Sequence, residues 1–170
     1  MRTWSSSRDF DLIPIPASSI THVHSLEDQL AVWRMCHGNL RPGGRLLVEV
    51  TMPNLASFSD SFRVPPRTPV EIDIDNINES DGTRLIRRKT TRYLSHEQRA
   101  QIRFMYEKYQ NGRGVETFLD DFESHVFFPR ELRLLFSHTG FEVEETIGDY
   151  LGRPLKAGSP VMIMIGRCPS

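Results

Sequence analysis

The chain has 170 residues, of which 25% are charged and 38% are apolar, a composition typical of a globular protein with one ordinary core. Its 21 basic and 22 acidic residues give a formal charge of −1, so no overall field attracts nucleic acid or an anionic membrane. No stretch approaches about 18 consecutive apolar residues and the first residues lack the apolar run of a secretion signal, so we expect a cytoplasmic protein.

The first half of the chain predicts a strand, a helix and a second strand. Residues 11–16 form a short apolar run, which is typical of a buried strand, and the polar run 17–22 follows it. Ser25 predicts the N-cap of a helix. Its core-facing stripe would contain Leu26, Leu30, Trp33, His37 and Leu40. The sequence "RPGG" ends this helix before a buried strand over residues 45–50, and the order predicts a parallel βαβ unit.

The middle of the chain predicts an antiparallel sheet made from two hairpins. Residues 70–77 alternate between apolar and polar side chains, and residues 83–94 return after a short turn. The register of this turn would pair Glu71 with Lys89, Asp73 with Arg87, and Ile74 with Ile86. A second hairpin would bring Tyr106 to Phe118. Because charge and apolar pairing agree in both hairpins, we expect one continuous sheet.

The last third predicts a helix and two closing strands. Pro129 is suited to the first helical turn, and Gly140 to the position after the last turn. The apolar stripe of this helix would be Leu132, Leu135 and Phe136. The closing strands lie within residues 141–150 and 160–168.

Several features suggest a binding site but have simpler explanations. The basic run from Arg84 to Arg92 could bind an anionic ligand through Arg87 and Arg88, but acidic residues face it in the predicted hairpin, so we expect an ion-paired strand. A cluster of four potential metal ligands begins the first helix, at His22, His24, Glu27 and Asp28. No second cluster completes it, so we predict no metal site. Cys36 lies on the apolar helix face and is expected to pack in the core.

The run from Phe10 to Val50 resembles the middle of class I S-adenosylmethionine-dependent methyltransferases of the small-molecule type. "FDLI" is similar to the fourth strand of that sheet, "LRPGG" to the turn before the fifth, and "SSITHV" to the loop of the "SSIGHL" type in those enzymes. "LRLLFSHTGFEVEE" resembles the late helix and sixth strand, and "PVMIMIGRC" the reversed seventh strand. The resemblance covers nearly all 170 residues.

The resemblance implies an α/β fold, the C-terminal part of a Rossmann-like methyltransferase sheet (strands four to seven) with an inserted antiparallel β layer. Residues 1–170 would form a single partial domain, with a core from 1–51 and 129–170. Residues 52–128 would be the insertion, acting as a substrate lid or a dimerisation layer. The family's first three strands and glycine-rich cofactor loop have no counterpart in this sequence, so strand 11–16 would be an exposed edge that pairs with another chain.

The resemblance also implies a truncated S-adenosylmethionine-dependent methyltransferase acting on a small-molecule acceptor. His22 would be the general base, or else a histidine bonded to backbone. The cofactor would be bound by Met1, Arg2, Pro16, Ala17, Ser18 and Ser19, although both serines could simply form the turn. The substrate would be bound by Arg63, Tyr93, Tyr150 and Arg153. The alternative is a catalytically inactive partner or regulatory subunit that needs another chain, or a second copy, to complete its sheet. The acceptor, and whether nitrogen, oxygen or carbon is methylated, is not identified.

Overall fold

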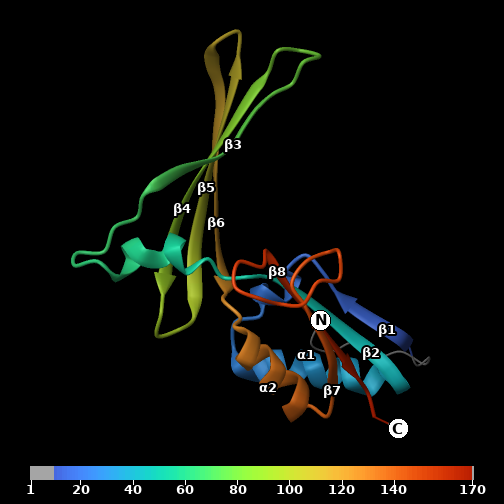
Figure 1. Ribbon diagram of the computed structural model, residues 1–170. Coiled ribbons are helices and arrows are strands. Elements are labelled where there is room, and N and C mark those ends of the chain that lie inside the picture. Colours follow the sequence, from blue (N-terminus) through green and yellow to red (C-terminus); the bar gives the residue numbers. More distant parts are fainter. Residues whose placement is uncertain (1–9, 170) are drawn as a thin grey trace. The chain divides into compact units, whose positions relative to one another are not determined.

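The computed structural model describes residues 10–169, which divide into two compact units (Figure 1). The first unit joins the segment up to Pro53 with the segment from His125, and the second runs from Asn54 to Ser124. The first unit contains β1 (Phe10–Ile15), η1 (Ser19–His22), α1 (Leu26–Asn39), β2 (Leu40–Thr51), α2 (Pro129–His138), β7 (Glu142–Ile147) and β8 (Val161–Arg167). The second contains η2 (Leu55–Phe62), β3 (Val70–Ile77), β4 (Arg84–Leu94), β5 (Arg99–Gln110) and nearly all of β6 (Arg113–His125).

The first unit is built on a mixed sheet with the strand order β1-β2-β8-β7. β1 and β2 are parallel and α1 connects them, so the predicted βαβ unit is confirmed. β8 runs antiparallel to both β2 and β7, which confirms the reversed closing strand. Within residues 10–169, β1 pairs with β2 alone and therefore forms an edge of this sheet.

Helix α1 begins where the sequence predicted but presents a slightly different face to the core. The Ser25 side chain accepts a hydrogen bond of 3.1 Å from the Asp28 amide, so the predicted N-cap is confirmed. Trp33 is fully buried, as expected. The prediction for Leu26 was wrong, because its side chain is 62% exposed. Leu26 is the first helical residue, and side chains in a helix point toward its N-terminus, here beyond the edge of the core.

The two helices share the core of the first unit. The Trp33 ring meets the Phe136 ring edge to face, with 5.7 Å between centroids. The predicted stripe of α2 is confirmed, since Leu132, Leu135 and Phe136 are all buried. Gly140 has a φ of +91° and terminates α2 as predicted, and the following Phe141 amide donates to the Phe136 carbonyl.

The second unit is an antiparallel sheet with the order β3-β4-β5-β6 (Figure 1). The predicted pairing of Glu71 with Lys89 is confirmed. The pairing of Ile74 with Ile86 was wrong, because a register shift between Ile72 and Ile74 places Ile74 opposite Arg87. A bulge of this kind inserts one residue that the turn length does not reveal.

Side chains across the second sheet follow the predicted pattern despite this shift. The Arg87 guanidinium still donates to the Asp73 carboxylate, with Nε 2.7 Å from Oδ2. Tyr106 stacks on Phe118, with 4.4 Å between ring centroids and 9° between planes, so that contact is confirmed. No helix within residues 10–169 is both long enough and apolar enough to cross a membrane.

Candidate functional site

The loop that follows β1 has an unusual backbone. Ala17 and Ser18 have φ values of +54° and +56°, the left-handed region that residues with a Cβ seldom occupy. Each such residue costs about 1–2 kcal/mol. Strain of this kind concentrates where a ligand is bound. The loop also lies at the carboxyl end of a parallel strand, where open α/β sheets bind their ligands.

Side-chain hydrogen bonds hold this strained loop against β2. The Ser18 hydroxyl oxygen accepts a hydrogen bond of 2.9 Å from the Thr51 amide and lies 3.1 Å from the Thr51 hydroxyl. The Ser19 hydroxyl donates to the Pro16 carbonyl at 2.7 Å. Both serine hydroxyls are therefore engaged in shaping the loop, while the small side chains of Pro16 and Ala17 are exposed.

His22 closes the short helix η1 at the end of this loop. Ile20, two residues earlier, is completely buried and anchors the segment in the core. The His22 side chain itself is exposed. An imidazole nitrogen can act as a general base, so an exposed ring on an anchored loop is suited to accept a proton from a bound group.

Tyr150 reaches the same strand from the other end of the sequence. Its hydroxyl donates to the Glu49 carboxylate at 2.7 Å, and this hydrogen bond raises the pKa of Tyr150. Glu49 and Thr51 are two residues apart on β2, so they lie on the same face of the sheet. The structure therefore brings Ser18 and Tyr150 to neighbouring positions on one strand. The nearby Arg153 pairs with Asp149.

The other two predicted substrate residues lie together in the second unit. The Tyr93 ring stacks on Phe58, with 4.5 Å between centroids, and its amide donates to the Ser61 hydroxyl. Arg63 forms an ion pair with Asp60. A role for Tyr93 and Arg63 in substrate binding stays a prediction. Met1 and Arg2, the remaining predicted cofactor residues, lie outside the described residues.

Glu49 and Thr51 were missed in the sequence. They fall in and just after a strand that reads as continuously buried, and their partners are 101 and 33 residues away. The alternation of Glu49 and Thr51 with buried Val48 and Val50 is the signal that could have indicated a polar face.

An apolar groove of about 240 Å³ lies between β1 and α1. Ile13, Pro14, Ile15 and Pro16 line it from the strand side, and Val32, Met35 and Cys36 from the helix. On the same strand Leu12 is 49% exposed. Among the strands of residues 10–169 only β2 pairs with β1, whose other edge is flanked by these apolar side chains, an arrangement typical of a surface that pairs with another strand.

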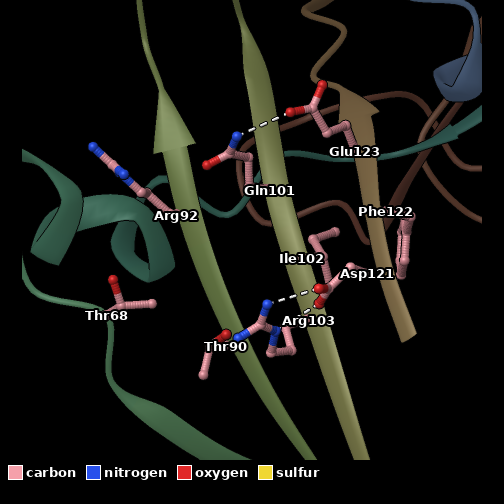
Figure 2. A pocket seen from close by; sticks show the side chains of 9 residues that line it. All are labelled: Thr68, Thr90, Arg92, Gln101, Ile102, Arg103, Asp121, Phe122 and Glu123. Carbon is pink, nitrogen blue, oxygen red and sulfur yellow. Dashed lines mark hydrogen bonds and ion pairs between the residues drawn. The ribbon is translucent and has the colours of Figure 1, made fainter. Parts of the chain in front are cut away.

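A second cavity, of about 400 Å³, lies within the second unit (Figure 2). Figure 2 shows Gln101 bonded to Glu123 and Arg103 bonded to Asp121 along its wall. Thr68, Thr90 and Arg92 complete the polar part of the lining. Arg92 has no ion-pair partner among the described residues.

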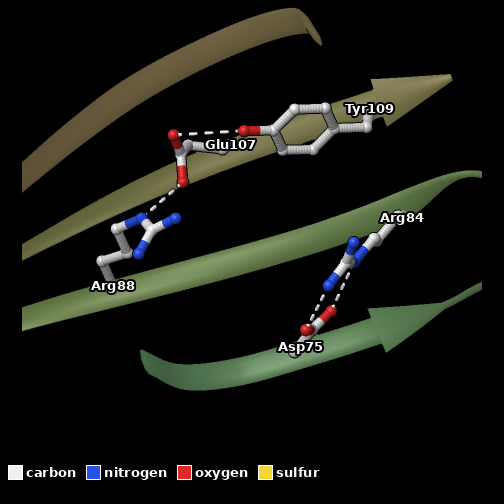
Figure 3. Close-up of polar contacts among 5 residues, drawn as sticks. All are labelled: Asp75, Arg84, Arg88, Glu107 and Tyr109. Atoms are coloured by element: carbon white, nitrogen blue, oxygen red, sulfur yellow. Dashed lines mark hydrogen bonds and ion pairs between the residues drawn. The ribbon is translucent and has the colours of Figure 1, made fainter. Parts of the chain in front are cut away.

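Three arginines of the basic run, Arg84, Arg87 and Arg88, form ion pairs within the sheet, and Figure 3 shows two of them. Arg84 donates two hydrogen bonds to Asp75, at 2.7 and 2.6 Å, which lower the pKa of that carboxyl group. Arg88 donates to Glu107 at 2.7 Å, and the Tyr109 hydroxyl donates to the same carboxylate. The ion-paired strand expected from the sequence is therefore confirmed. Within residues 10–169 no three His, Cys, Asp or Glu side chains are arranged to hold a metal ion.

Comparison with known proteins identifies the fold. No protein-family model matches the sequence, and no curated protein matches it. Solved structures match nearly the whole chain. An S-adenosylmethionine-dependent methyltransferase from Clostridium acetobutylicum ATCC 824 is 9% identical, with a TM-score of 0.74 over 99% of this chain and 62% of that one. DesVI from Streptomyces venezuelae is 21% identical, with a TM-score of 0.70 over 99% and 62%.

A third match is CalS10 from Micromonospora echinaspora, an amino pentose methyltransferase with S-adenosylmethionine bound. It is 16% identical, with a TM-score of 0.71 over 98% of this chain and 61% of that one. The chain thus spans about three fifths of the length of these structures. Over that length this chain has the Rossmann-like α/β fold of S-adenosylmethionine-dependent methyltransferases.

Proposed function

We propose that this chain forms part of a cytoplasmic S-adenosylmethionine-dependent methyltransferase that transfers a methyl group to a small-molecule acceptor. The main support for the proposal is the loop at the carboxyl end of β1. It combines a strained backbone, an exposed histidine and a side-chain hydrogen bond to the neighbouring parallel strand. The likeness to methyltransferase structures supports it.

The residues of the loop fit one side of the cofactor. Pro16 and Ala17 present small exposed side chains, while Ser18 and Ser19 fix the backbone, so the methionine part of the cofactor can approach closely. Met1 and Arg2 would contribute from the N-terminal segment. When bound, S-adenosylmethionine supplies a methyl group activated by a sulfonium. The sequence contains no glycine-rich loop that follows a strand and opens a helix, so the remaining contacts would come from another segment or chain.

The acceptor would lie beside His22, which would take its proton as the methyl group is transferred. Within the first unit, Tyr150 and Arg153 would orient the acceptor. Positioning of this kind is the main contribution that a protein makes to an in-line displacement. Since one match is an amino pentose methyltransferase, amino sugars are the first acceptors to test.

A second candidate function is that of an inactive, methyltransferase-like partner or regulatory subunit. The edge of β1 and the adjoining apolar groove favour it, because they offer a surface on which another chain could complete the sheet. A second copy of this chain could occupy the same surface and form a homo-oligomer.

The two functions are separated by measuring cofactor binding and methyl transfer with the purified 170-residue chain. Equilibrium dialysis with methyl-labelled S-adenosylmethionine gives binding, and transfer of label to amino sugars gives activity. We expect His22→Gln to retain binding and to lose transfer by about 10²–10⁴-fold. His138→Gln, an exposed histidine at the end of α2, is the matched control and should change neither. Since a second copy could supply the remaining contacts, the deciding measurement is made at high concentration, and failure of the wild-type chain to bind the cofactor there would favour the inactive partner.

A further inference from the structure

A third cavity, separate from the β1 loop, lies between α2, β7 and the segment that follows β7. Its volume is about 380 Å³, within the range of small-molecule sites. Arg130 and Arg133 stand on one wall and Thr146 on another, while Pro129, Pro154 and Leu155 supply an apolar surface. No carboxylate is among the described residues that line it.

The two arginines retain most of their donor capacity. The Arg133 side chain donates one hydrogen bond to the Thr146 hydroxyl, with Nη2 3.2 Å from Oγ1. Arg130 has no hydrogen-bond or ion-pair partner among residues 10–169. Both side chains are exposed and lie one turn apart on α2, so two like charges are close together. An anion placed between them would relieve that repulsion.

Neither arginine has an obvious role in stabilising α2. Both stand in the N-terminal half of the helix, where the helix dipole disfavours a cation. The acid of the first turn, Glu131, is directed elsewhere: it lies 2.8 Å from the His125 ring nitrogen and accepts from the Phe128 amide. The positive charge of the cavity is therefore not compensated by its own helix.

The opposite wall of the cavity is fixed by backbone hydrogen bonds. The Leu155 amide donates to the Thr146 carbonyl at 3.3 Å, and the Gly148 amide donates to the Arg153 carbonyl at 2.7 Å. Ile147 forms a bridge with Pro154. Met164, the partner of Thr146 on the neighbouring strand β8, is fully buried. The site is thus largely formed before any ligand arrives.

We propose that this cavity binds a small oxyanion, a carboxylate or a phosphate ester, attached to an apolar group. Each guanidinium group can donate a pair of hydrogen bonds to two oxygens of such an anion, and Thr146 can add a hydroxyl contact. The cavity is larger than an inorganic phosphate, and its apolar surface would cover the rest of the ligand. The site depends on neither the cofactor nor the acceptor of the proposed methyl transfer.

The proposal is tested by NMR titration of the ¹⁵N-labelled full chain with phenyl phosphate, benzoate, inorganic phosphate and benzyl alcohol. We expect phenyl phosphate or benzoate to bind saturably and to shift the amides of residues 130–133 and of residues 146–155 other than Pro154. The stronger of these two probes identifies the anion. Inorganic phosphate lacks the apolar group and benzyl alcohol lacks the charge, so both should bind more weakly.

Variants identify the residues responsible. Arg130→Gln/Arg133→Gln should weaken binding about tenfold or more, because two charge-assisted contacts are removed. Arg34→Gln/Arg67→Gln removes the same charge from exposed arginines elsewhere and should bind like the wild type. Equal loss in both double variants, shifts confined to other segments, or no saturable binding of either aromatic anion would overturn the proposal.

Discussion

The strained backbone of the loop after β1 predicts that replacing Ala17 with glycine stabilises the protein, which is the opposite of the usual effect of this change. Replacing alanine with glycine ordinarily destabilises a protein by about 0.5–1 kcal/mol, because glycine gains more freedom in the unfolded chain. At Ala17, with φ at +54°, the same change removes a left-handed strain of about 1–2 kcal/mol. The difference predicts that Ala17→Gly stabilises the first unit by about 0.7 kcal/mol.

Ala31→Gly is the matched control. Ala31 lies inside α1, away from the positions with positive φ, so glycine there should cost about 1 kcal/mol. Urea unfolding followed by helical circular dichroism measures both, since α1 and α2 belong to the first unit. The reasoning would be refuted if Ala17→Gly destabilised the chain as much as Ala31→Gly does.

The same variant also tests whether the strain serves binding. If Ala17→Gly stabilises the fold and weakens the binding of S-adenosylmethionine, the strained backbone is a pre-organised part of the cofactor site. If binding is unchanged, the left-handed turn serves only to connect β1 to η1, and cofactor binding does not depend on it.

Three further outcomes are expected. Gly166→Ala should lower the free energy of urea unfolding by about 1–3 kcal/mol, because a Cβ there would lie 2.6 Å from Cε1 of Phe136. Gly38→Ala is the control, since Gly38 has open space around it and a Cβ there makes no such contact. Burial raises the pKa of Cys36 to about 11, above its unfolded value near 9, so its contribution to stability should be full below pH 9 and fall by about 2 kcal/mol as pH rises to 11. Cys36→Ala should flatten this part of the stability profile. Leu12→Lys places a charge on the exposed β1 edge and should lower the mass measured by light scattering at high concentration. An unchanged mass, or a wild-type protein that stays monomeric, would show that this edge does not mediate self-association.

The elements that could be predicted from the sequence are those specified by local chemistry. Ser25 caps α1 through an amide three residues away, and Gly140 ends α2 through its own backbone conformation. The parallel pairing of β1 and β2 also followed, because a helix between two apolar runs allows few other arrangements. Each of these depends on residues that are close in sequence or on a strict topological rule.

The errors arose where a structure departs from a regular repeat by one position. The bulge between Ile72 and Ile74 changed the partner of every later residue in β3, although Asp73 still reached Arg87 because a long side chain tolerates the shift. Leu26 has the right spacing for the core but the wrong place along the helix axis. Periodicity indicates which face is buried and not how far the core extends.

The organisation of the candidate site was beyond sequence reasoning for a different reason. Ser18 bonds to Thr51, and Tyr150 bonds to Glu49, and both contacts exist only because β2 lies between segments from opposite ends of the chain. The sequence indicated polar residues after β1 and before β8 and gave no measure of their proximity. The resemblance to methyltransferases suggested Tyr150, but not the carboxylate that it contacts.

The edge strand β1 and the strained loop that follows it are both attached to β2. β1 is held on one side by β2, and Ser18 extends that attachment past the end of the strand to Thr51. On its other side no strand of the described residues pairs with β1, and the groove that adjoins it continues to Pro16 and Ser19 of the loop. Any strand that completes the sheet would therefore contact the loop from the side that β2 leaves open. Under the proposed function, completing the sheet and binding the cofactor use the same few residues, so a partner that occupied the edge would also complete the cofactor site. This coupling would make an otherwise inert chain catalytic only in its assembled form.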